Sequence, residues 1–261
     1  MRVACGVHML PGVRWSRVWL IEGDDEVALV DAGPPWASSA VADYLRSIGR
    51  GLQDVSLILI THGHPDHFGG AASLRLMTGA RIVAHPADCR RLSDGTWSLS
   101  YLGAGSVPAP VPFFRRTPVD LLVGDGDVLP FSRAVRALHT PGHSPGSLCY
   151  LLEEERVLFT GDTLFSDGSE LARSAPFPKS DRSLYGRSVA RLAALEFDVV
   201  CGGHGRALAG NGSAAVRERV RRSPEPPGWG QVLARLAGRT GRLSGSKRRR
   251  RDPRPPGDTG G

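Results

Sequence analysis

The sequence predicts a mixed α/β (α+β) protein, because short apolar segments typical of strands alternate with segments whose apolar residues recur at helical spacing. VSLILIT (55–61) is almost wholly apolar, as expected of a strand in a sheet that is covered on both faces. RVLFTG (156–161) and FDVVCGG (197–203) share this character. The 261 residues, of which 41% are hydrophobic and 23% charged, suit one large globular domain with additions, or two small ones.

The first elements can be assigned in chain order. VWLIEG (18–23) and EVALVDAG (26–33) are predicted strands on either side of an acidic turn. A helix should follow and should end at Gly49 and Gly51, since apolar residues lie on one helical face at Ala40, Val41, Tyr44, Leu45 and Ile48. After the strand at 55–61, we expect a second helix over about residues 67–78.

Later segments repeat this design of a strand followed by a polar loop. RIVAHPAD (81–88) is a predicted strand that runs into a helical start, and CYLLEEERVLFTGDTLF (149–165) is a predicted hairpin. His143 lies in a turn rich in Pro and Gly between two strands, and His204 follows the strand at 197–203. The proline-rich segment 106–120 should be an extended loop, either a surface connection or a lid over a pocket. The polar candidates therefore lie on loops at strand ends, where rigid sheets present functional groups.

Charge is distributed unevenly along the chain. Residues 1–216 hold 20 Lys and Arg against 22 Asp and Glu, whereas residues 217–261 hold 13 against 4. We therefore expect a near-neutral globular domain at 1–216, a short basic helical extension at 217–243 and a disordered basic tail at 244–261. The formal net charge of +7 belongs to the C-terminal end, so it does not predict nucleic-acid binding by the whole protein.

Two further features bear on the compartment. No apolar run approaches the roughly 20 residues of a membrane helix, and the N-terminus lacks the apolar core of a secretory signal. The cysteines are far apart and form no CxxC pair; they are Cys5, Cys89, Cys149 and Cys201. We expect buried free thiols in a reducing cytoplasm, rather than a zinc ribbon or a redox pair.

A dense group of metal-binding residue types lies in THGHPDHFGG (61–70). His62, His64, Asp66 and His67 fall within six positions, on the loop that leaves a predicted strand. A catalytic metal needs several imidazoles and carboxylates that converge on it. In a loop, His62 and His64 can face one ion, while Asp66 and His67 can face a second. Further candidates lie in matching contexts, namely His143 in HTPGHS, Asp162 in FTGDTLF and His204 in GGHG.

The motifs VDAG, THGHPDHFGG, HTPGH, FTGDTLF and GGHG, in this order, resemble those of the metallo-β-lactamase-fold hydrolase superfamily over about residues 15–208. The resemblance implies a four-layer αββα sandwich with the metal site along one edge of two facing sheets. It also implies two metal sites, the first held by His62, His64 and His143, the second by Asp66, His67 and His204, with Asp162 bridging both. Asp31 in VDAG resembles the aspartate that hydrogen-bonds near the ligands, with a simple turn aspartate as the alternative.

This resemblance implies a metal-dependent hydrolase that acts on a small-molecule substrate. Two divalent ions about 3.5–4 Å apart lower the pKa of a shared water enough to supply hydroxide near neutral pH. Asp66 is the expected catalytic residue, because it can orient that hydroxide and relay a proton. Zinc is the expected metal, and iron and manganese also suit mixed nitrogen and oxygen ligands. No protein general acid is evident, which favours a leaving group that needs little protonation, as in a thioester, ester or lactone.

Several alternatives stay open at this point. Asp162 lies where zinc β-lactamases of the main subclass have a cysteine, which favours the glyoxalase II and lactonase branches. However, SDGSELARSAPFP (166–178) departs from the glyoxalase II pattern, and the glutathione-binding helical domain has no clear counterpart. A mononuclear iron sulfur dioxygenase would share the first site. A nucleic-acid-processing phosphodiesterase fits the neutral body poorly, although KRRRR (247–251) leaves nucleic acid open, and the oligomeric state is open too.

Overall fold

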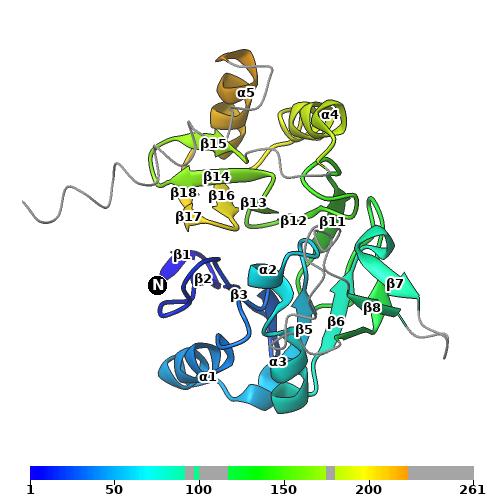
Figure 1. The fold of residues 1–261 in the computed structure, drawn as a ribbon. Helices are drawn as coiled ribbons and strands as arrows, with labels where there is room; N and C mark the ends of the chain where they lie inside the picture. The colour runs from blue at the N-terminus through cyan, green and yellow to red at the C-terminus, as the bar shows by residue number, and fades with distance from the viewer. Residues whose placement is uncertain (92–96, 100–116, 175–179, 223–261) are drawn as a thin grey trace, which may run out of the picture.

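The computed structural model describes residues 1–91, 97–99, 117–174 and 180–222, and in these residues two sheets face each other between two layers of helices (Figure 1). The expected four-layer sandwich is therefore confirmed. The larger sheet has seven strands in the order β1-β2-β3-β4-β5-β6-β10, and the second has five in the order β11-β12-β13-β16-β18.

The strands of the larger sheet are β1 (Arg2–Ala4), β2 (Val7–Met9), β3 (Trp19–Glu22), β4 (Val27–Val30), β5 (Val55–Leu59), β6 (Arg81–Ala84) and β10 (Leu121–Leu122). Those of the second sheet are β11 (Val135–His139), β12 (Leu148–Leu152), β13 (Val157–Gly161), β16 (Val199–Gly202) and β18 (Leu208–Ala209). Two small sheets are formed by β15 (Leu171–Arg173), β14 (Leu164–Asp167) and β17 (Gly205–Arg206), and by β7 (Cys89–Arg91), β8 (Trp97–Leu99) and β9 (Pro118–Val119). The strands predicted at 18–33 and the hairpin predicted at 149–165 are present as β3–β4 and β12–β13.

Helices cover the outer face of each sheet. Helices α1 (Ser38–Ser47) and α3 (Ala71–Thr78) lie on the larger sheet, and α4 (Arg182–Leu192) and α5 (Gly212–Arg222) lie on the second (Figure 1). Short turns complete the chain path, namely η1 (Leu52–Asp54), α2 (Pro65–Phe68) and η2 (Pro86–Asp88). Helix α1 buries Val41 and Leu45, as its periodicity predicts. It ends before Gly49, whose φ of +75° suits glycine.

Apolar side chains from both sheets fill the space between them. Trp19 on β3 meets Phe159 on β13 edge to face, with ring centroids 6.3 Å apart. Strand β5 shows why its sequence is apolar throughout, since Leu57 and Leu59 face the second sheet whereas Ile58 faces the helices. Both faces of this strand are therefore buried, as the sequence predicts.

The direction of the strands gathers several loops at one edge. Strands β4, β5 and β6 are parallel neighbours, so the residues that follow them, Asp31, His62 and Asp88, leave the sheet in the same direction. Strands β13 and β16 of the second sheet are also parallel, and they are followed by Asp162 and His204. Parallel pairing thus delivers polar residues from distant parts of the sequence to one edge.

The helix expected over about residues 67–78 is present as α3 and ends at Thr78 as expected, but it begins later, because the short helix α2 precedes it and the two are separated by a break at Gly69 and Gly70. The backbone groups at the break bond to the loop after β4 instead of continuing one helix. His67 O accepts a hydrogen bond from Ala32 N at 2.7 Å, and Gly70 N donates to Gly33 O at 2.9 Å. A Cβ at Gly70 would lie 2.4 Å from Ala32 O, so only glycine permits this approach.

Other expectations have mixed outcomes. Cys149 and Cys201 are buried free thiols as expected, but Cys5 is exposed and Cys89 is half-buried. Within the described residues, no helix is long and apolar enough to cross a membrane. Helix α5 continues past residue 216 to Arg222, into the predicted basic extension. Most of the proline-rich segment, residues 223–243 of the extension and the tail at 244–261 lie outside the described residues.

Candidate metal centre

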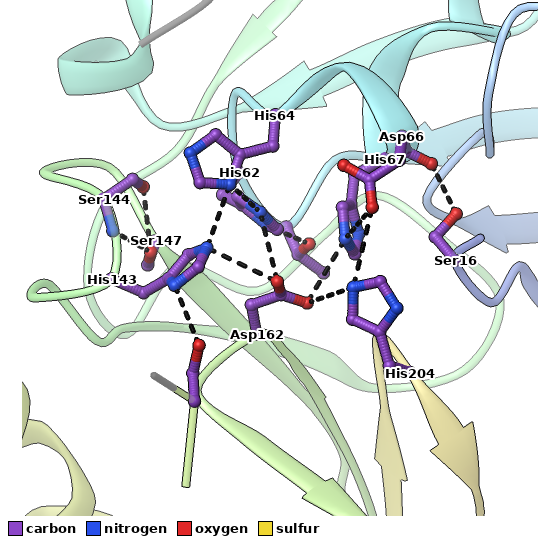
Figure 2. A network of polar contacts seen from close by, with 12 residues as sticks. Ser16, His62, His64, Asp66, His67, His143, Ser144, Ser147, Asp162 and His204 are labelled. Carbon is purple, nitrogen blue, oxygen red and sulfur yellow. Dashed lines mark hydrogen bonds and ion pairs between the residues drawn. The ribbon is translucent and has the colours of Figure 1, made fainter. Parts of the chain in front are cut away.

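The seven residues that the sequence nominated as metal ligands converge at the edge where the two sheets meet (Figure 2). They divide into two groups, and the ligand atoms within each group lie within 4.8 Å of one another. The first group is His62, His64, His143 and Asp162, and the second is Asp66, His67 and His204. Each comes from a strand end: the loop and short helix after β5, the β11–β12 turn, the end of β13 and the β16–β17 turn.

Three imidazole nitrogens crowd together in the first group. His64 Nδ1 lies 3.0 Å from His62 Nε2 and 3.0 Å from His143 Nε2. Asp162 Oδ2 lies 3.4 Å from the same nitrogen of His143. Two nitrogens bound at 2.0–2.1 Å to one tetrahedral ion are separated by roughly 3.3 Å, so this spacing fits a shared cation.

The imidazoles of the second group lie between its own carboxylate, Asp66, and that of Asp162 from the first group. Asp66 Oδ2 lies 3.5 Å from His67 Nε2 and 3.5 Å from His204 Nε2. The other oxygen of Asp162, Oδ1, lies 3.2 Å from His67 Nε2 and 3.4 Å from His204 Nε2. Asp162 therefore turns one oxygen to each group, and the two groups share this residue.

Two buried polar atoms at the junction lack a hydrogen bond. His67 Nε2 and Asp162 Oδ1 are inaccessible to solvent and meet no partner with hydrogen-bond geometry in the described part of the chain. An unsatisfied buried group is costly, and a cation placed between such atoms would satisfy both. The donor set of imidazole nitrogens and carboxylate oxygens suits zinc, iron or manganese. The residues present therefore fit a divalent metal ion.

Burial sets the charge state of the first group. It lowers the pKa of His62 well below its usual value, lowers that of His64, and lowers that of His143 to about 3. These imidazoles are therefore neutral near pH 7, which is the form that binds a metal ion.

Carboxylates dominate the second group. Burial alone would lower the pKa of His67 and of His204, but Asp162 and Asp66 outweigh it and raise both. Conversely, burial would raise the pKa of Asp162, but His204 and His67 hold it well below its usual value. The arrangement thus stabilises positive charge between the carboxylates, where a cation would also be stable.

A buried carboxylate orients the second group from behind. Asp31 is 1% exposed and accepts hydrogen bonds from Thr61 N at 2.8 Å and Thr61 Oγ1 at 2.9 Å. Its Oδ2 lies 2.7 Å from His67 Nδ1, so this nitrogen donates and the other ring nitrogen faces Asp162. Thr61 Oγ1 also lies 3.0 Å from His62 Nδ1. The sequence nominated Asp31 for this position behind the ligands, and its contacts are those such a residue would make.

Two serines position other members of the site. Ser174 Oγ lies 3.1 Å from His143 Nδ1, so His143 Nε2 points at His64. Ser16 Oγ donates a short hydrogen bond to the backbone oxygen of Asp66 (Figure 2). The side chains of Asp66 and His204 are each 28% exposed, whereas those of His62 and His143 are almost fully buried. Asp66 and His204 are therefore the members of the site that solvent reaches, whereas His67 of the same group is fully buried.

The sequence interpretation missed Asp88. This aspartate is 1% exposed and accepts hydrogen bonds from Gly63 N at 2.7 Å, Ser144 Oγ at 2.7 Å and Gly146 N at 2.6 Å. Burial raises the pKa of its carboxyl, and these hydrogen bonds oppose that rise. One signal was available, since Asp88 follows β6 much as His62 follows β5.

The chain matches one known family and several known proteins. Residues 12–204 match the metallo-β-lactamase superfamily. The chain is 35% identical over 187 residues to the uncharacterized protein ML0493 of Mycobacterium leprae, covering 70% of this chain and 82% of that protein. It is 33% identical over 174 residues to a hydroxyacylglutathione hydrolase of Anaeromyxobacter dehalogenans, covering 67% of this chain and 56% of that protein. It is also 32% identical over 176 residues to the acyl-coenzyme A thioesterase MBLAC2 of Homo sapiens, covering 59% of this chain and 60% of that protein. The match thus spans less than two thirds of the length of these two named hydrolases.

Solved structures agree with this result. A metallo-β-lactamase family protein from Thermus thermophilus superposes with a TM-score of 0.66 at 27% identity, covering 90% of this chain and 81% of that one. The MIM-2 metallo-β-lactamase gives a TM-score of 0.65 at 26% identity, covering 92% and 89%.

Proposed function

The chain belongs to the metallo-β-lactamase superfamily, and from that premise we propose that it is a metal-dependent hydrolase that cleaves a small thioester, ester or lactone. The proposed cofactor is a pair of divalent ions, with zinc as the first metal to test. We assign this activity to residues 1–216, with residues 217–243 as a basic extension and 244–261 as a basic tail. The proposed ligands are His62, His64 and His143 for one ion, Asp66, His67 and His204 for the other, and Asp162 for both.

One observation carries the proposal for two ions. Asp162 turns Oδ2 to His143 at 3.4 Å and Oδ1 to His67 at 3.2 Å and His204 at 3.4 Å. A one-ion enzyme needs only the first group. The second group has a complete set of two imidazoles and a carboxylate around the other oxygen of Asp162, which supports two ions and weighs against the iron dioxygenase alternative.

Bound divalent ions would supply an acidified water as nucleophile and would polarise the substrate carbonyl. The chain's own residues would then orient the reacting groups and transfer protons. Asp66 is the candidate for proton transfer, because its carboxylate contacts His67 and His204 through Oδ2 only, as far as the described residues go, and is partly exposed. Ser16 donates a hydrogen bond to the backbone oxygen of Asp66 and so holds the main chain that carries this carboxylate.

The leaving group is the second part of the proposal. His62, His143 and His67 all turn a nitrogen into the cluster and hold the other by a hydrogen bond, so none of the three is placed to protonate a departing group. A thiol has a pKa of about 8.5 and can depart as thiolate without a protein acid. The relatives named hydroxyacylglutathione hydrolase and acyl-coenzyme A thioesterase support a thioester as the first substrate class to test.

The proposal can be tested with a substrate panel. Thioesters, lactones, phosphodiesters and β-lactams would be assayed with protein loaded with zinc, iron or manganese. We expect metal-dependent thioester, ester or lactone hydrolysis, which Asp66→Ala and His143→Ala remove while the circular dichroism spectrum of the fold is kept. Turnover that survives complete metal removal would contradict the proposal, and oxygen uptake by a one-iron form would replace it with a dioxygenase.

A further inference from the structure

We propose that Asp88 is a positioning residue for the first metal group, because its buried carboxylate holds together the two loops that carry His62, His64 and His143. This inference rests on the proposed metal centre and adds a residue that supports one ion of the pair. The hydrogen bonds of Asp88 go to sequence neighbours of the proposed ligands rather than to the ligands themselves.

On both loops, Asp88 accepts a hydrogen bond from a residue that is directly adjacent in sequence to a proposed ligand. Asp88 Oδ2 accepts from Gly63 N, which lies between His62 and His64 in sequence, at 2.7 Å. The same oxygen accepts from Ser144 Oγ, directly after His143, at 2.7 Å. One carboxylate oxygen therefore bridges segments that are 81 positions apart, from residue 63 to residue 144.

The turn after His143 is closed around the same carboxylate. Asp88 Oδ1 accepts from Gly146 N at 2.6 Å. Ser144 N donates to Ser147 Oγ at 2.9 Å, which fixes the turn internally. A Cβ at Gly146 would lie 2.6 Å from Asp88 Cγ and Oδ1, so any larger residue would displace the carboxylate. Glycine is therefore required for this close approach.

The geometry of the first group depends on the distance between these loops. His64 Nδ1 and His143 Nε2 are 3.0 Å apart although they belong to different loops. A backbone hydrogen bond of 2.8 Å from Leu148 N to Thr61 O also joins the two chain segments, at the strand ends. Loss of Asp88 should therefore leave the strands paired but loosen the loops that carry the histidines.

The test measures zinc affinity and stoichiometry by competition with a chromogenic chelator. The variants are Asp88→Asn, Asp88→Ala and Gly146→Ala, which disturb the contact from both sides. Asp120→Asn is the matched control, because Asp120 also accepts a backbone hydrogen bond, from Ile82 N at 2.8 Å, but touches no metal loop within the described residues. Residues behind metal ligands typically change affinity by about 10–100-fold when mutated. We expect a loss of this size for one of the two zinc equivalents in Asp88→Ala, a smaller loss in Asp88→Asn, and none in the control.

Three outcomes are distinguishable. Selective weakening of one equivalent supports the inference, since a residue that only stabilised the fold would lower the melting temperature without changing the affinity of the folded protein. Wild-type affinity for both equivalents in folded Asp88→Asn and Gly146→Ala would overturn it and leave the metal centre standing, even if Asp88→Ala does not fold. A wild-type protein that binds only one equivalent would overturn the proposed two-ion function, and the effect of the Asp88 variants on that single equivalent would then decide the inference.

Discussion

Replacing Asp31 by asparagine should weaken metal binding by the second group although the side chain keeps its size. The Asp31 carboxylate accepts from Thr61 N at 2.8 Å and from His67 Nδ1 at 2.7 Å, so His67 can offer Nε2 to a metal ion. An amide can satisfy only one of these two donors. If its nitrogen faces His67, the ring proton moves to Nε2 and blocks the metal; if it faces Thr61, a buried backbone N–H loses its partner.

The size of the effect follows from these contacts. A hydrogen bond to a charged group contributes about 1.5–3 kcal/mol, and about 1.4 kcal/mol corresponds to tenfold in affinity. We therefore expect Asp31→Asn to weaken one zinc equivalent roughly 10- to 100-fold. Zinc competition with a chelator measures this, with Asp120→Asn as control for a lost backbone contact elsewhere.

Asp31 and Asp88 lie behind different metal groups. Asp31→Asn and Asp88→Asn should weaken different equivalents, because Asp31 contacts His67 whereas Asp88 joins the loops of His64 and His143. The double variant should then lose affinity at both. An Asp31→Asn protein that binds two zinc ions as tightly as the wild type would refute the reasoning about the His67 tautomer.

The remaining predictions concern catalysis, metal dependence, pH and packing. Asp66→Asn keeps an oxygen that can bind the second ion, and at saturating zinc it should lower kcat by about 10²-fold or more, because proton transfer by a positioned side chain contributes at least this much. Steady-state kinetics on a thioester, with bound zinc measured on the same samples, would check it, and an unchanged kcat would remove Asp66 from that role. Chelation should abolish hydrolysis and added zinc should restore it. His85 is stacked on His139 with ring centroids 4.0 Å apart, and burial lowers the pKa of His85 to about 4. Its contribution to stability is therefore present above the unfolded-state pKa of about 6.5 and is lost as pH falls towards 4. His85→Asn, which keeps an acceptor for Ala87 N, should lose melting temperature less steeply over this pH range, and an equally steep loss in both proteins would contradict this. Gly70→Ala should lower the melting temperature of the metal-free protein, because its Cβ would lie 2.4 Å from Ala32 O.

The sequence predicted the main elements of the fold because their signals are local. The apolar run of β5, the periodic face of α1 and the strand pair β3–β4 each contain enough information to be assigned alone. The break between α2 and α3 could not be read in this way. It depends on two hydrogen bonds with the loop after β4, more than 30 positions earlier in the chain: Gly70 N donates to Gly33 O, and His67 O accepts from Ala32 N.

The residues of the candidate site also divide into those with a local sequence signal and those whose role depends on distant parts of the chain. Its histidines could be nominated because their residue type and loop context are visible in the sequence, and the structure brings all seven nominated residues together. Asp88 is harder to nominate, because its place after a strand is a weak signal, an aspartate there is common, and its importance depends on which loops fold over it. The parallel pairing of β5 with β6 places its carboxylate beside Gly63, and the β11–β12 turn of the second sheet then meets it through Gly146.

We propose that one chain holds two metal ions that act together in hydrolysis. The most direct measurement is a titration of the metal-free protein with zinc, in which bound metal and thioester hydrolysis are followed on the same samples. We predict that each chain binds two zinc equivalents and reaches full hydrolysis only when the second is bound. Asp162→Ala should lose this link between the second equivalent and hydrolysis. Saturation at one equivalent with full activity, or activity in the metal-free protein, would contradict this account.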